Sequence, residues 1–151
     1  MTKSKRMQPV ARVADQRERQ AAVEMAEFRR FLDAQQAKLD ELNTYRNDYA
    51  RHFEQAGRGG MDAARMADYR RILARLNDAI AYQEKRLISL HNDYEQVRRR
   101  WTDTRTRAAA LDKVMERYRA EELRETEQRE QGESDERAQR AGPGTAGARE
   151  S

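Results

Sequence analysis

The sequence predicts an all-α fold, an antiparallel two-helix coiled coil with a disordered C-terminal tail. Ala, Glu, Lys, Leu and Arg make up 79 of the 151 residues, a share typical of coiled coils. Ile, Leu, Val and Phe number only 20, too few for a globular core but enough for a narrow seam between helices. Two long stripes of apolar residues are separated by a cluster of glycines.

The first eight residues are expected to form a basic arm. No apolar segment follows them, so we expect no signal peptide. The longest apolar runs hold four residues each, far short of a membrane span. The sequence has no cysteine, which removes disulfides and thiolate metal ligands and favours a reducing cytoplasm.

A first helix is expected over residues 9–56. Pro9 suits the first turn of a helix, where its missing N–H leaves no bond unmade. The apolar stripe of this helix follows steps of three and four and consists of Met25, Phe28, Leu32, Gln35, Leu39, Leu42, Tyr45, Tyr49 and Phe53.

A hairpin turn is expected at residues 57–61, because three of the four residues from Gly57 to Gly60 are glycine. Asp62 is a candidate N-cap for a second helix that runs to near Gln128. Its stripe keeps the same steps for more than seven heptads. The members are Met66, Tyr69, Leu73, Leu76, Ile80, Gln83, Leu87, Leu90, Tyr94, Val97, Trp101, Thr104, Ala108, Leu111, Met115 and Tyr118.

If the chain folds back near Gly59, each residue of one stripe faces a residue of the other, and the numbers of every facing pair add to 118 or 119. Gln35 then faces Gln83. A buried amide pair would penalise slipped registers, whereas two glutamines at the edge of the seam would be hydrated, and the sequence leaves both possibilities open. Met115 and Tyr118 have no partner within the chain, so either another surface covers them or the helix end is frayed or self-associated.

The C-terminal part is expected to be a disordered acidic tail over residues 129–151. Residues 121–151 carry a net charge of −4, against +8 for the rest of the chain. Apolar spacing is lost near Glu125, and glycines appear among Ser, Glu and Arg. Such a composition buries too little apolar surface to order itself.

No constellation of residues predicts catalysis. His52 and His91 lie far apart in the hairpin and are expected on the surface, so we expect neither a metal site nor a cofactor. The glycine cluster lacks the Gly-Lys-Ser/Thr ending of a phosphate-binding loop. The carboxylates lie among arginines on helix surfaces, without a cleft. We therefore expect a protein that is not an enzyme.

Arg98–Arg100, with Arg105 and Arg107, forms a basic stretch that an arginine-rich nucleic-acid binder could use. Acidic residues are interspersed and the single Trp occupies a seam position, so attraction to an acidic protein surface is favoured. A self-assembling coiled-coil scaffold is a further alternative.

A second stripe follows each helix beside the seam. It makes a part-aromatic patch suited to a partner protein, or else a widened packing face. It consists of Lys38, Leu42, Tyr45 and Tyr49 on one helix and Ile72, Leu76, Ala79 and Gln83 on the other.

The chain resembles the flagellar FliJ family, the stalk protein of the flagellar type III export ATPase. The similarity covers about residues 6–125. It is carried by the basic start running into Arg6-Met7-Gln8-Pro9-Val10, by Leu42-Asn43-Thr44-Tyr45-Arg46-Asn47-Asp48-Tyr49, by the glycine turn, and by the segment from Tyr69 to Ile80.

The resemblance implies a non-catalytic stalk that looks like the central γ subunit of rotary ATPases. Its joined terminal helices enter the pore of a hexameric export ATPase, promote ring assembly and link hydrolysis to the export gate. It also implies binding to the cytoplasmic domain of that gate and escort of export chaperones, with no nucleic acid and no membrane insertion. The protein would be cytoplasmic, peripheral at the inner membrane. The stalk of a virulence type III secretion system is a close variant.

The resemblance also implies a gate-contacting surface, in which Lys38, Ile72 and Gln83 replace the glutamine, phenylalanine and histidine associated with the family. By match, this surface comprises Leu42, Tyr45, Tyr49, Ile72, Leu76, Ala79 and Gln83.

For the ring, antiparallel pairing is expected to gather arginines of both helices at one end, where they steer the stalk into an acidic pore. Met115 and Tyr118 would add apolar contact. The expected ring-binding residues are Arg12, Arg17, Arg98, Arg99, Arg100, Arg105, Met115 and Tyr118.

Overall fold

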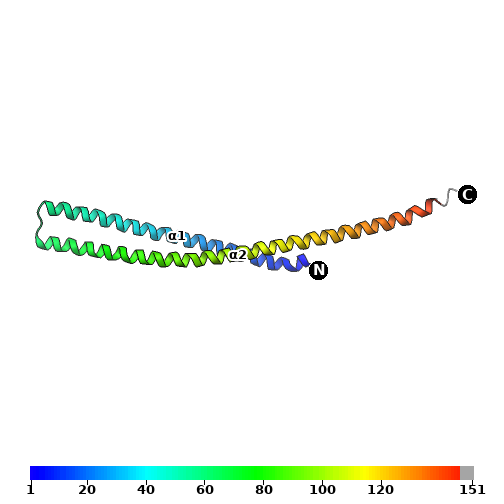
Figure 1. Cartoon of the computed structure of the whole chain (residues 1–151), viewed down its shortest axis with the longest axis horizontal. Helices are drawn as coiled ribbons and strands as arrows, with labels where there is room; N and C mark the ends of the chain where they lie inside the picture. The colour runs from blue at the N-terminus through cyan, green and yellow to red at the C-terminus, as the bar shows by residue number, and fades with distance from the viewer. Residues whose placement is uncertain (147–151) are drawn as a thin grey trace. The chain divides into compact units, whose positions relative to one another are not determined.

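The computed structural model of the chain describes residues 1–146 and consists of two helices, α1 (Lys3–Arg58) and α2 (Ala63–Ala146) (Figure 1). They pack against each other in antiparallel directions, which confirms the predicted all-α coiled coil. Neither helix, within the residues described, has a stretch long and apolar enough to cross a bilayer.

The chain divides into two compact units, and each helix contributes to both. The hairpin unit is Arg19–Asp103, which includes the turn. The terminal unit joins Met1–Glu18 to Thr104–Ser151.

The turn between the helices is built from glycine and an aspartate cap. Gly60 has a φ of 86°, in the left-handed region that only glycine adopts without steric cost. The N–H of Gly59 donates to the carbonyl of Gln55 at 3.3 Å and closes the end of α1. Asp62 Oδ1 accepts the N–H of Arg65 at 2.8 Å, which confirms Asp62 as the N-cap of α2.

The core of the hairpin unit is the predicted seam between the two helices. A pair of helices encloses only a narrow strip, so most seam residues are half-buried and few are fully covered. The apolar side chains of this unit that are at most 9% exposed are Ala21, Leu32, Ile80, Leu87 and Val97.

The contacts across the seam include pairs expected from the sequence and pairs one turn away from them. Gln35 and Gln83 are hydrogen-bonded, as the expected sum of 118 requires. Phe28, however, stacks on Tyr94 with ring centroids 6.0 Å apart, one turn beyond its expected partner Leu90. The numbers of that pair add to 122.

The position of the turn explains this difference. The helices flank it at Arg58 and Ala63, so the centre of the hairpin lies between residues 60 and 61 rather than at Gly59. Each side chain then reaches partners on either side of a facing level, as knobs-into-holes packing requires.

In the terminal unit, α1 begins at Lys3, six residues before its expected start, and Pro9 lies inside the helix. The first turn is capped from α2, because a Glu122 carboxylate oxygen accepts the backbone N–H of Ser4 at 3.0 Å. The other oxygen accepts the Ser4 hydroxyl at 2.7 Å. The expected basic arm over residues 1–8 is therefore largely helical.

This earlier start changes the surroundings of Met115, which was expected to lack a partner within the chain. Met115 is only 4% exposed and shares a groove with Gln8 and Ala11 of α1. The Lys3 ammonium lies 5.6 Å from the centre of the Tyr118 ring. The start of α1 therefore covers the residues that were predicted to extend past it.

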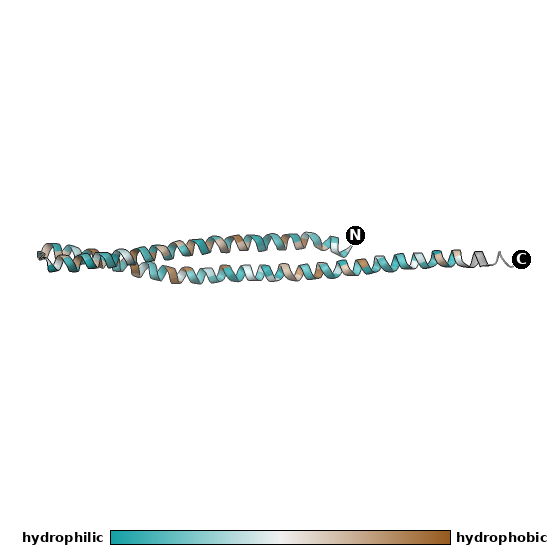
Figure 2. Ribbon diagram, turned by 90° about the horizontal axis from the view of Figure 1, so that it is seen from above, coloured by the Kyte–Doolittle hydropathy of each residue, from teal (hydrophilic) through white to brown (hydrophobic). Residues whose placement is uncertain are grey.

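α2 continues as a helix to Ala146, beyond its expected end near Gln128. Residues 129–142 are exposed throughout, and Figure 2 shows hydrophilic colours along most of this stretch. Charged residues one turn apart favour a helix locally, but a helix that packs on nothing gains little stability. Disorder of residues 129–151 in solution therefore stays a prediction, and 147–151 lie outside the described residues.

Candidate partner-binding surfaces

Six of the seven expected gate-contacting residues reach the surface of the hairpin unit. Tyr45 is 58% exposed and Ile72 is 39% exposed, so these two supply the most accessible apolar area. The other four are half-buried. We call the six residues the flank patch: Leu42, Tyr45, Tyr49, Ile72, Leu76 and Ala79.

Gln83 is the exception and must be removed from the expected surface. It is only 1% exposed. Its Nε2 donates to both the backbone carbonyl and the side-chain Oε1 of Gln35, each at 3.0 Å. The buried interpretation of the glutamine pair is therefore correct, and the amide of Gln83 is committed to the seam.

The exposed Tyr45 belongs to a cluster of aromatic rings. The ring centroids of Tyr45 and Tyr49 are 6.3 Å apart, and those of Tyr49 and Tyr69 are 5.1 Å apart. Partial burial raises the pKa of the Tyr49 hydroxyl, and Tyr69, Tyr45 and Asp68 raise it further. This hydroxyl therefore stays protonated at neutral pH and remains a hydrogen-bond donor.

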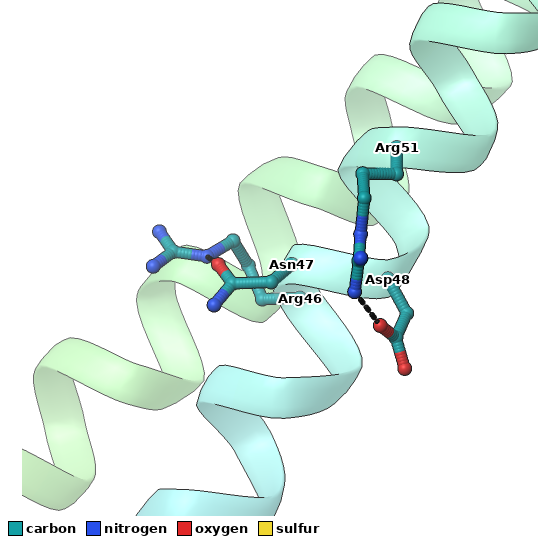
Figure 3. Close-up of polar contacts among 4 residues, drawn as sticks. All are labelled: Arg46, Asn47, Asp48 and Arg51. Carbon is teal, nitrogen blue, oxygen red and sulfur yellow. Dashed lines mark hydrogen bonds and ion pairs between the residues drawn. The ribbon is translucent and has the colours of Figure 1, made fainter.

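Arg46, rather than Tyr45, occupies the seam position that follows Leu42. Its side chain is half-buried, and its guanidinium donates to Oδ1 of Asn77 on α2 at 3.1 Å. Its Nε also donates to Oδ1 of Asn47 at 3.0 Å, and Figure 3 shows these two side chains together. A step of four from Leu42 keeps the heptad, which leaves Tyr45 on the flank. The expectation that Tyr45 belongs to the seam was wrong.

Figure 3 also shows the neighbouring pair Asp48 and Arg51, whose carboxylate and guanidinium are in contact on the surface of α1. Both side chains are more than half exposed. Exposed ion pairs of this kind add little stability. Because both side chains are exposed, their charges remain accessible to a partner.

The expected ring-binding arginines are exposed in both units. Arg98 forms an ion pair with Glu95 at 3.7 Å, with both side chains more than half exposed. Their gathering at one end of the molecule stays a prediction. The exposed arginines are Arg12, Arg17 and Arg105 in the terminal unit and Arg98, Arg99 and Arg100 in the hairpin unit.

The apolar residues expected to contact the ring are less accessible than the arginines. Tyr118 is half-buried, and Met115 is buried against the start of α1. The groove that Met115 lines has a volume of about 310 Å³ and is otherwise formed mainly by polar and charged side chains. In this conformation, Met115 contributes little surface to a partner.

The contact between Ser4 and Glu122 was missed by reasoning from the sequence. The backbone N–H and the hydroxyl of Ser4 lower the pKa of the Glu122 carboxyl, and Arg119 and Lys5 lower it further. A signal was present, because continuing the two stripes in steps of three and four leads to both residues. A polar pair at the end of an apolar seam carries no hydrophobic signal and is easily overlooked.

The histidines are placed as predicted, since His52 and His91 are both exposed. In the described part of the chain, no group of three His, Cys, Asp or Glu side chains could hold a metal ion. What the arrangement offers is two helical surfaces, one part-aromatic and one rich in arginine, both suited to protein contacts.

Comparison with known proteins identifies the family of the chain. Neither the curated proteins nor the solved structures compared with the chain give a match. The sequence profile of the family described as flagellar FliJ protein matches residues 3–143, which is most of the chain. The chain therefore belongs to the flagellar FliJ family, a component of flagellar export.

Proposed function

We propose that this chain is the non-catalytic central stalk of the flagellar type III export ATPase. The terminal unit enters the pore of the hexameric ATPase ring, promotes its assembly and links hydrolysis to the export gate. The flank patch of the hairpin unit contacts the cytoplasmic domain of that gate. The family match over residues 3–143 is the observation that carries the proposal.

The ring contact is supported by charge and by the paired form of the terminal unit. Arg12 and Arg17 are exposed on α1, and Arg98–Arg100 are exposed on α2. Exposed arginines accelerate association with an acidic surface and form bidentate contacts with carboxylates. The hydrogen bonds from Ser4 to Glu122 tie the start of α1 to α2, so that two helices are presented together.

The gate contact is supported by the exposure of two large apolar side chains on a flank. Tyr45 and Ile72 together combine an aromatic and an aliphatic anchor, the kind of residue that dominates protein interfaces. The ring of Tyr49 stacks on Tyr45 and is itself in contact with Tyr69, which restricts Tyr45 and lowers the entropy lost on binding.

Escort of export chaperones and a peripheral position at the cytoplasmic face of the inner membrane belong to the same proposal. Both rest on the family alone. Purification of the tagged chain from its native cytoplasm, followed by identification of the bound proteins, tests them. Recovery of export chaperones with the hexameric ATPase supports this part, and recovery of RNA or ribosomal proteins contradicts it.

Charge reversal of arginines tests the ring contact. The triple variant Arg98→Glu, Arg99→Glu and Arg100→Glu should reduce stimulation of the export ATPase, with the largest loss at low salt. A matched control, Arg51→Glu, Arg58→Glu and Arg65→Glu, makes the same change of net charge at exposed positions beside the turn. The control should stimulate as the native chain does. Equal stimulation by both variants would reject the ring contact.

A further inference from the structure

The first residues of α1 are held differently from the rest of the helix. Pro9 lies inside α1 and has no N–H, so the carbonyl of Lys5 loses one of the bonds that join the first turns to the rest of the helix. Helix ends fray readily, so contacts with α2 add to the stability of residues 3–8.

Those contacts are concentrated on one carboxylate. Glu122 accepts the backbone N–H and the hydroxyl of Ser4, at 3.0 and 2.7 Å. A negative charge at this position also favours the N-terminus of α1 through the helix dipole. The ammonium of Lys3 lies over the Tyr118 ring at 5.6 Å and adds a cation–π contact.

The residues beneath this segment are apolar. Met115 is 4% exposed, in a groove that is lined by Gln8 of this segment and by Ala11, beyond Pro9. Tyr118 is half-buried in a cavity of about 340 Å³ that is also lined by Lys3, Arg6 and Glu122. Detachment of the segment at Pro9 would uncover Tyr118 and remove Gln8 from beside Met115, so both side chains would gain contact with water. The contacts that hold the segment on α2 are mostly polar, whereas the side chains that it covers are apolar. A partner that replaces these polar contacts can therefore bind the apolar side chains.

We propose that residues 3–8 form a strap, hinged at Pro9 and fastened by Glu122, which covers Tyr118 and part of Met115 and uncovers them when it is released. The strap is a property of the isolated chain and is tested without any partner. Its use in the ring contact, which would employ the two uncovered residues, rests on the proposed function.

The test measures oxidation of individual methionines in the full chain by dilute hydrogen peroxide, followed by mass spectrometry of peptides. Met115 reports release of the strap. Met1 is 90% exposed and serves as the reference for full reactivity. Met25 is half-buried in the hairpin unit and reports general loosening of the two helices.

Three variants are expected to change the oxidation rate of Met115 differently. In Glu122→Gln, Met115 should be oxidised roughly three to ten times faster than in the native chain, because a charged acceptor of two hydrogen bonds is lost. Glu125→Gln makes the same charge change at a carboxylate lining the same cavity and should leave the rate unchanged. Pro9→Ala restores the missing helical N–H and should slow oxidation of Met115.

The strap is overturned if Glu122→Gln and Glu125→Gln oxidise Met115 at the same rate, or if Pro9→Ala does not slow it. It is also overturned if the rate at Met25 rises in parallel with Met115, because the whole hairpin would then be opening. Failure of these tests leaves the ring contact standing. Failure of the arginine test in turn leaves the strap standing.

Discussion

At the scale of single residues, the hydrogen bonds between Gln35 and Gln83 determine how the two helices align. Both N–H groups of the Gln83 amide have acceptors on Gln35, so the buried side chain is satisfied only in this register. A shift of one turn would place Gln83 against apolar side chains with its N–H groups unpaired, which is costly. One polar pair therefore selects a register among alternatives that the apolar stripe alone would tolerate.

Gln83→Ala should lower the free energy of unfolding by about 2 kcal/mol, because it removes two hydrogen bonds and leaves a gap in the seam. The double variant Gln35→Leu, Gln83→Leu should be more stable than Gln83→Ala, since both polar partners are replaced together. Urea unfolding followed by circular dichroism measures the difference. Gln36→Ala, at an exposed neighbouring position, serves as the control. A double variant less stable than Gln83→Ala would contradict the assigned role.

The Ser4 and Glu122 contact should depend on pH. The pKa of Glu122 is lowered in the folded chain, chiefly by the hydrogen bonds from Ser4. Its contribution to stability is therefore present above the ordinary carboxyl range and is lost as the pH falls through the lowered pKa. Lys5 and Arg119, which lie near the carboxylate, also lower the pKa of Glu122.

A titration followed by nuclear magnetic resonance measures this effect on the Glu122 side chain. Ser4→Ala removes the hydroxyl but keeps the backbone N–H, so the pKa of Glu122 should rise toward its usual value without reaching it. If Glu122 titrates at the same pH in the native chain and in Ser4→Ala, the hydroxyl bond does not form in solution.

At the scale of elements, two glycines near the turn have opposite roles. Gly57 lies in the last turn of α1, and a Cβ added there would meet nothing within 4 Å. Gly60 has a positive φ, where any other residue is strained. One glycine is therefore a weakness of the helix, and the other is required by the turn.

Gly57→Ala should raise the free energy of unfolding by about 0.5–1 kcal/mol, because alanine loses less conformational entropy in a helix. Gly60→Ala should lower it by about 1 kcal/mol, through strain in the left-handed region. Thermal unfolding of the two variants side by side gives the comparison. The same sign of change for both would show that the turn is placed differently from the structure.

The helices were largely predictable because the apolar residues of a coiled coil recur at steps of three and four along the sequence. The seam, the turn and the Asp62 cap follow from spacing and residue type alone. The start of α1 was not predictable from Pro9. Proline is tolerated in the first turn of a helix, and also deeper in a helix when a residue such as Glu122 binds the preceding turn. The centre of the turn was not predictable either, since any of the three glycines could have taken the positive φ.

The candidate surfaces were predictable to a smaller extent. Residue type favours Tyr45 for the stripe and the heptad spacing favours Arg46. The exposure of Tyr45 and the contact of Arg46 with Asn77 decide between them. Gln83 belongs to both the seam and the flank stripe, and burial decides that case. Periodicity locates the edge of a seam within one residue, and a binding surface depends on which side of that edge a side chain lies.

At the scale of the whole molecule, we assign the two proposed partners to different surfaces. The terminal unit and the exposed Arg98–Arg100 of the hairpin unit carry the proposed ring contact, and the flank patch of the hairpin unit carries the proposed gate contact. Family membership establishes a role in flagellar export, and the division of labour between the units is our proposal. A stalk that couples an ATPase to an export gate needs two separate binding surfaces. Altering one surface should therefore leave binding at the other unchanged.

Site-specific photo-cross-linking tests this division most directly. A photoreactive residue at Arg12, exposed in the terminal unit, should cross-link to the hexameric export ATPase, and one at Tyr45, exposed in the flank patch, should cross-link to the cytoplasmic domain of the export gate. We expect this pairing in native membranes with the assembled export apparatus. Cross-links from Tyr45 to the ATPase and from Arg12 to the gate would contradict it.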